Sequence, residues 1–114
     1  MTTQKIADRL VQLCRNGEFV KAEQELYDSE ILHVEADGQE FMGFDVVLSK
    51  EKEFLEKLES KPLVEVSEPL VAGDHFSISM HMEFVHTERG AKKIDEILVY
   101  KVENGKIVYL KCYL

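Results

Sequence analysis

The stretch LYDSEILHVEADGQEFMG, residues 26–43, decides the fold that this sequence predicts. A short helix ends at its first two residues, a strand follows over Ile31–Glu35, and Asp37-Gly38 turns the chain back towards Gly43. Glu35 is the one acid at the end of this strand. Its carboxylate is either solvated at a strand end or placed in a pocket, and the stretch alone leaves both open.

Helical patterns lie on both sides of this stretch. Apolar residues recur at helical spacing from Thr3 to the left-handed stop that Asn16-Gly17 provides. The apolar stripe Phe19, Ala22 and Leu26 predicts a second, shorter helix that ends before Asp28-Ser29. A third helix is expected to be capped by Asp45 and closed by Lys61-Pro62.

From Leu63 onward the hydrophobic period changes to two. Turns at Gly73-Asp74, Glu88-Arg89-Gly90 and Asn104-Gly105 divide this part into four expected strands. Alternate residues over 76–84 are apolar, so this face should meet the helices. Helices first and a meandering antiparallel sheet afterwards predict an α+β fold with helices on one face.

The last two expected strands are apolar on both faces. Ile97 and Val99 lie on one side of the first, whereas Leu98, Tyr100 and Val102 lie on the other. One set can pack under helices, but the second needs another partner. We therefore expect a homodimer built on the outer face of the sheet.

Composition restricts the class of protein. A chain of 114 residues fits one core, so we expect one domain over 1–114. The net charge is −8, and such a chain repels nucleic acid and anionic membranes. No segment approaches the ~20 apolar residues of a membrane span, and no secretory signal is recognisable. Cys14 and Cys112 lack zinc or redox spacing, which favours free, buried thiols in the cytoplasm.

This layout resembles the nuclear transport factor 2-like superfamily, in particular its SnoaL-like branch. The resemblance rests on the Asn16-Gly17 stop, on residues 26–43 and on the ending Asn104-Gly105-Lys106-Ile107, and it covers nearly the whole chain. It implies a cone-shaped, cystatin-like fold in which three helices and a curved antiparallel sheet enclose a pocket. The superfamily includes isomerases, cyclases, dehydratases, ligand carriers and interaction modules, so the fold alone selects no activity.

Similarity to the ketosteroid isomerases of the superfamily implies roles for single residues. Glu35 falls where their general-base Asp stands, and Asp95 falls where their protonated oxyanion-hole Asp stands. His33 shares the face of Glu35 and is a candidate to tune or relay its proton. Leu10 falls near the position of their oxyanion-hole Tyr and can donate no hydrogen bond.

In this register Asp95 shares its face with Ile97 and Val99, whereas a one-residue slip would turn Glu96 inward instead. An alternative is that Asp95 is solvated and pairs with a nearby lysine. The pocket should be mostly apolar and should take a small apolar organic ligand. Its expected lining residues are Ile6, Leu10, Tyr27, Phe54, Met80, Met82, Phe84, Ile97, Val99 and Leu110.

We expect no metal and no cofactor. His81 and Glu83 share a strand face with His75 nearby, but this face should point outward and lacks a third spaced ligand. Three functions stay open: a small-molecule-binding domain, a proton-transfer isomerase, cyclase or dehydratase with Glu35 as base and Asp95 as donor, and a non-catalytic dimerisation or interaction module.

Overall fold

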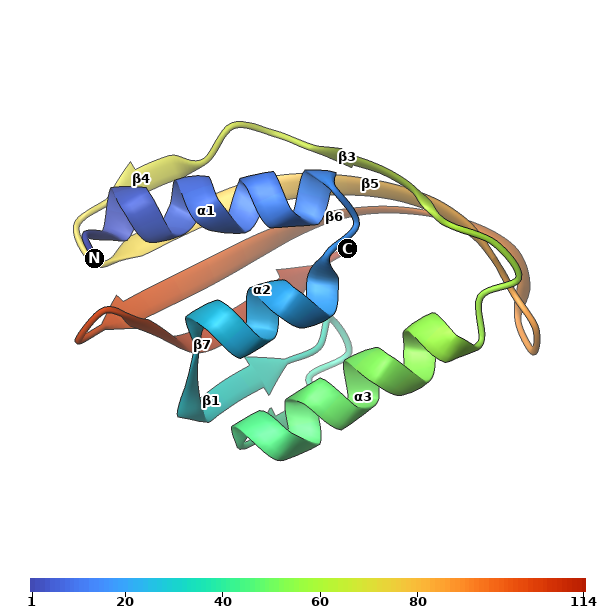
Figure 1. Ribbon diagram of the computed structural model, residues 1–114, viewed down its shortest axis with the longest axis horizontal. Coiled ribbons are helices and arrows are strands. Elements are labelled where there is room, and N and C mark those ends of the chain that lie inside the picture. The colour runs from blue at the N-terminus through green and yellow to red at the C-terminus, as the bar shows by residue number, and fades with distance from the viewer.

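Three helices form where apolar residues recur at helical spacing, and the expected helix count is confirmed (Figure 1). The structure, a computed structural model, describes residues 1–114. No helix has the length and apolar content that a membrane crossing requires. The helices are α1 (Thr3–Arg15), α2 (Phe19–Leu26) and α3 (Phe44–Glu56).

Local chemistry explains the helix boundaries. The Thr2 hydroxyl accepts a hydrogen bond from the Lys5 amide at 3.2 Å and caps α1. Gly17 follows α1 with φ of 73°, a left-handed conformation that glycine adopts without strain. Gly43, and not Asp45, is the N-cap residue of α3. Asp45 lies instead in the first turn, where its carboxylate interacts favourably with the helix dipole.

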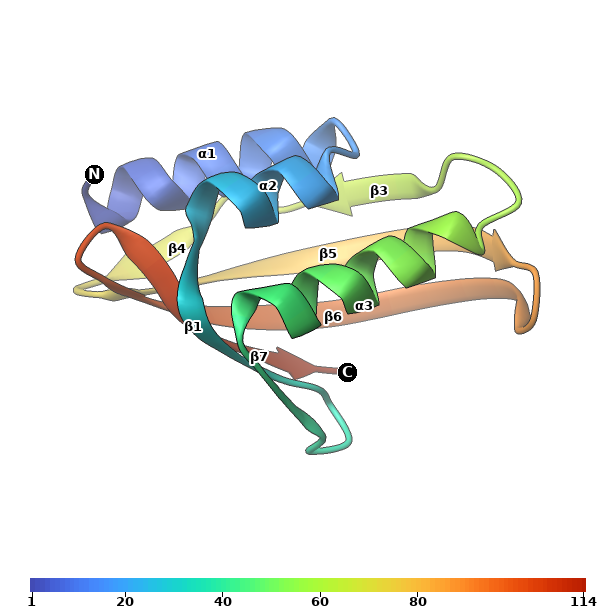
Figure 2. The same ribbon diagram turned by 60° about the horizontal axis from the view of Figure 1, so that its bottom comes forward.

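Seven strands form one curved sheet, and the helices lie on one side of it (Figure 2). The strand order is β2-β1-β7-β6-β5-β3, with β4 paired to β5. Only β1 and β7 run parallel. The expected α+β class is therefore confirmed. The strands are β1 (Tyr27–Val34), β2 (Glu40–Met42), β3 (Leu63–Val66), β4 (Leu70–Ala72), β5 (His75–His86), β6 (Gly90–Glu103) and β7 (Lys106–Tyr113).

Three expected boundaries were wrong. β1 begins directly after α2, rather than at Ile31, and Glu35 opens the turn that follows it. The segment from Leu63 to Ala72 forms two strands, because Pro69 between them has no amide hydrogen for a sheet ladder. α3 ends before Lys61-Pro62, because its next residues pair with the turn between β5 and β6, where the Thr87 amide donates to the Lys57 carbonyl at 2.8 Å.

The core lies between the helices and the concave face of the sheet. Ile6 and Leu13 of α1 and Ile31 of β1 are at most 1% exposed. Phe76 of β5 stacks on Tyr100 of β6 with ring centroids 4.6 Å apart. These contacts hold α1 against the sheet and fix which strand faces point inward.

The outer face of the sheet keeps exposed apolar side chains. Along β6, Leu98 and Tyr100 point inward, whereas Ile97 and Val99 point outward. Ile97 is 52% exposed and lies beside Tyr113 of β7, which is 47% exposed. A homodimer would cover these side chains, and the homodimer stays a prediction.

If the outer face forms the dimer, Ile97→Glu should convert it to a monomer, because the substitution buries a carboxylate in an apolar interface. Light scattering at micromolar concentration measures the mass. Val46→Glu adds the same charge at a half-exposed position of α3 and should leave the dimer intact. A monomeric wild-type protein would contradict the prediction.

Candidate functional site

A cavity of about 820 Å³ lies between the helices and the concave face of the sheet. This volume falls within the roughly 300–1,000 Å³ of small-molecule sites. Glu35 and His33 line it, as the sequence led us to expect. Six of the expected ligand-binding residues also line it, namely Leu10, Tyr27, Phe54, Met80, Met82 and Leu110.

The other four expected lining residues lie elsewhere. Ile97 and Val99 point to the outer face, because the alternation of β6 is opposite to the one we expected. Ile6 is fully buried in the packing of α1 and does not reach the cavity. Phe84 is 6% exposed, and its ring meets the lining residue Phe54 edge to face at 5.1 Å. Phe84 therefore supports the cavity wall without forming it.

Asp95 is on the outside of the sheet, so its expected role as oxyanion donor is wrong. Its side chain is 82% exposed, and its Oδ1 lies 2.7 Å from Nδ1 of His81. Hydrogen bonds to Glu83 and Asp95 raise the pKa of His81. Glu96 faces the cavity instead. The larger apolar set of β6 lies on the face of Glu96, and burying that set decides the register.

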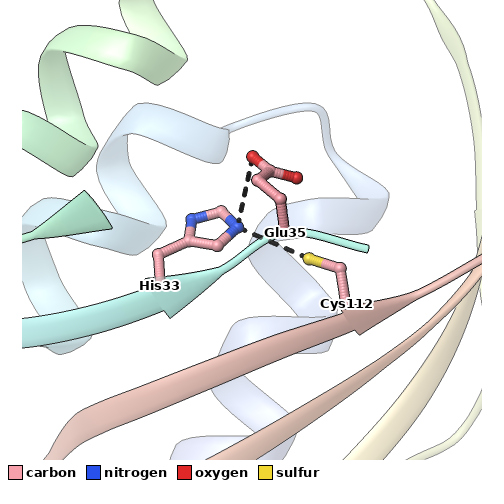
Figure 3. Close-up of side chains that lie close together, drawn as sticks. All are labelled: His33, Glu35 and Cys112. Atoms are coloured by element: carbon pink, nitrogen blue, oxygen red, sulfur yellow. Dashed lines mark hydrogen bonds and ion pairs between the residues drawn. The ribbon is translucent and has the colours of Figure 1, made fainter. Parts of the chain in front are cut away.

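β1 and β7 bring a nitrogen, an oxygen and a sulfur together at the cavity wall (Figure 3). His33 lies on β1, Glu35 follows it, and Cys112 lies on β7. The Nε2 atom of His33 is 3.4 Å from Cys112 Sγ and 3.6 Å from Glu35 Oε1. Burial lowers the pKa of His33 and raises that of Cys112 to about 12. His33 is therefore a neutral imidazole and Cys112 a thiol, so neither neutralises the charge of the Glu35 carboxylate.

Lys50 of α3 provides a positive charge at this wall. Its ammonium group forms an ion pair with Glu35 and lies 4.7 Å from the centre of the Phe41 ring. The Lys50 side chain is 40% exposed, so it reaches the site from the solvent side. The contact between the Lys50 ammonium group and the Phe41 ring is favourable. The Lys50 side chain nevertheless stays flexible, as lysine side chains are.

Three further carboxyl groups in the lining of this cavity have raised pKa values. Glu23 of α2 is 7% exposed, and its Oε1 has no hydrogen-bond partner. Burial, with the charge of Glu51, raises the pKa of Glu23 to about 9. Burial, with the charges of Glu35 and Glu51, raises the pKa of Glu96 to about 7. Burial also raises the pKa of Glu51. Lys50 opposes each shift. Protonated carboxyls of this kind donate hydrogen bonds.

The helical spacing of the sequence could have predicted that two of these acids are buried. Glu23 shares a helix face with Phe19 and Leu26, and Glu51 lies in the same apolar stripe as Val47. An acid inside an apolar stripe indicates a buried carboxyl group. The roles of Lys50 and Cys112 had no such indication, because each depends on contacts between distant segments.

Three helices on one face of a curved sheet, with a cavity between them, define the nuclear transport factor 2-like, or cystatin-like, class of fold. A Mesorhizobium loti protein assigned as a candidate SnoaL-like polyketide cyclase has a TM-score of 0.90 at 24% identity, with 100% of both chains covered. A Xanthomonas campestris protein with a cystatin-like fold has a TM-score of 0.81 at 15% identity, with 99% of this chain and 90% of that chain covered.

A Catenulispora acidiphila protein with a ketosteroid isomerase-like fold, solved in complex with trimethylamine, has a TM-score of 0.75 at 14% identity. The match covers 96% of this chain and 84% of that chain. A search of curated proteins finds no significant match. The family model of the SnoaL-like domain matches residues 1–114, so the chain belongs to the SnoaL-like domain family.

We expect stability to fall as the pH rises, because folding raises the pKa of Glu23 from 4.5 to about 9. Between these values the folded state holds the proton that the unfolded state has lost. The free energy of unfolding then decreases by at most about 1.4 kcal/mol per pH unit for this group. Glu23→Gln should flatten the decline in urea unfolding between about pH 5 and pH 9. Glu56→Gln, an exposed change on α3, should leave the slope as in the wild type.

Proposed function

We propose that this SnoaL-like domain binds a small organic molecule in the cavity. The observation that carries the proposal is Glu23, a carboxyl group inside a cavity of about 820 Å³ with one oxygen that has no partner. Leaving a buried polar group unpaired costs about 1–3 kcal/mol. A ligand that reaches Glu23 would recover part of this cost.

The wall indicates the chemistry of the ligand. Met80, Phe54 and Leu110 offer an apolar surface, and methionine side chains adapt to different shapes. The protonated carboxyls of Glu23 and Glu96 donate hydrogen bonds, so the ligand should carry an acceptor such as a carbonyl oxygen. The trimethylamine complex of the Catenulispora acidiphila protein supports a small organic occupant in a fold of this kind.

Nile red, a neutral apolar dye with a carbonyl group, should bind once per chain in a fluorescence titration. Leu110→Trp places a bulkier side chain in the cavity wall and should weaken binding, whereas Leu70→Trp changes a 75% exposed residue outside it and should not. Glu23→Leu should weaken binding about tenfold, because it removes a hydrogen-bond donor, and Glu23→Gln should retain it. Equal binding by wild type and Leu110→Trp would overturn the proposal.

A second candidate function is proton transfer beside a carbonyl group. Glu35 and Glu96 line one cavity, and the charge of Glu35 contributes to the raised pKa of Glu96. Glu35 would accept the proton from carbon, and protonated Glu96 would donate to the oxygen of the resulting enolate. Leu10 supplies no second donor. Isomerases, cyclases and dehydratases of this superfamily would use such a step.

Deuterium exchange into a cyclic ketone, followed by NMR in D₂O, tests this second function. Glu35→Gln should slow the exchange by about a hundredfold or more, because it removes the base. Glu96→Leu should slow it by about a hundredfold, because it removes the donor to the oxyanion. Asp95→Asn is the matched control on the outer face and should exchange like the wild type. Exchange that is unchanged in Glu35→Gln would exclude this mechanism.

A further inference from the structure

We propose that His33, Glu35 and Cys112 form a binding site for a zinc ion at the wall of the cavity. Each residue contributes one ligand atom, and the three atoms lie within 4.8 Å of one another. His33 and Cys112 are 79 positions apart in the chain. No short motif therefore marks the site in the sequence, and the fold creates it.

Two of the three spacings between these atoms fit zinc directly. Zinc bonds of about 2.0–2.3 Å in tetrahedral geometry hold neighbouring ligand atoms roughly 3.3–3.8 Å apart. His33 Nε2 is 3.4 Å from Cys112 Sγ and 3.6 Å from Glu35 Oε1. Both distances fall in this range, and a rotation of the Glu35 side chain would adjust the third spacing, which is at most 4.8 Å.

Both contacts converge on the same ring nitrogen, as Figure 3 shows. In a neutral imidazole Nε2 carries either a proton or a lone pair. It can donate to Glu35 or accept from the Cys112 thiol, but it cannot do both at once. A proton relay through the ring would need both nitrogens, so the arrangement does not form a catalytic triad. One cation at the meeting point would use a lone pair from all three residues.

The backbone holds the ligands in place. β1 and β7 pair in parallel, with His33 opposite Leu110, so Cys112 lies beside the end of β1. The Glu35 amide donates to the Gln39 carbonyl at 2.8 Å, and the Glu35 carbonyl accepts from the Gly38 amide at 2.9 Å. These hydrogen bonds fix the turn that carries Glu35. Ligands on fixed backbone lose little conformational freedom when they bind a metal.

The charges of the ligands themselves suit a dication. When zinc binds, the S–H bond of Cys112 breaks, the proton leaves to solvent and the thiolate binds the metal. One thiolate and one carboxylate then balance the charge of Zn²⁺. Nitrogen and sulfur ligands favour zinc over Mg²⁺ or Ca²⁺, which prefer oxygen.

Lys50 is the competitor for this position, because its ammonium group pairs with Glu35 in the metal-free site. Zinc has to displace that contact, and the exposed, flexible side chain of Lys50 can leave towards solvent. Lys50→Met should therefore raise the affinity for zinc. A general attraction of cations to an acidic surface predicts no such specific gain from one substitution in the site.

The test uses the full chain after chelator treatment, with no organic ligand present, so it does not depend on the proposed function. Calorimetry with Zn²⁺ alone should give one ion per chain. Substitution with Co²⁺ should give a thiolate-to-cobalt charge-transfer band. Cys112→Ala should lose this band and weaken zinc binding by about a hundredfold or more, since loss of a second-shell partner already costs about 10–100-fold. Cys14→Ala removes the other buried cysteine and should keep both signals.

Circular dichroism should show that each variant is folded, and Glu35→Gln gives an independent loss of affinity if Cys112→Ala does not fold. Absence of stoichiometric zinc binding in the folded wild type would overturn the proposal. Binding that persists in both Cys112→Ala and Glu35→Gln would also overturn it, because the ion would then lie elsewhere. Failure of zinc to bind leaves the Nile red result untouched, so the two proposals fail separately.

Discussion

The parallel pairing of β1 with β7 is the contact on which the cavity depends. It joins β1, which begins at Tyr27, to the last strand of the chain and places the C-terminal end of β1 beside Cys112. Every other strand pair is antiparallel. β1 lies between α2 and α3 in the chain, so this pair also helps to position both helices over the concave face.

Burial of acids in an enclosed space is the second constraint. Removing a carboxylate from water is costly, and proteins avoid the cost by protonation, by pairing or by a bound cation. This cavity combines the first two, with raised pKa values at Glu23 and Glu96 and an ion pair between Glu35 and Lys50. Such a distribution costs stability and has no use in core packing, and it is the reason for the proposal that the cavity binds a ligand.

The sequence predicted the architecture well, because periodicity and turn residues are local properties. The helix stop at Gly17 and the alternation of β5 follow from residues that are near one another in the chain. The prediction of which face of β6 points inward was wrong. Both faces carry apolar residues, and the position of Asp95 was transferred by resemblance. The burial of Leu98 and Tyr100, which depends on long-range packing, decides between Asp95 and Glu96.

The attachment of α3 at both ends has a consequence for how molecules reach the interior. The Gly43 amide donates to the Ile31 carbonyl at 2.8 Å before the helix, and the Lys57 carbonyl accepts from Thr87 after it. A hinged opening of α3 would break these backbone bonds. Among the residues that line the cavity, Lys57 forms ion pairs with Glu53 and Glu88. Exposed ion pairs weaken with salt, so the exchange rate of the proposed ligand should depend on ionic strength.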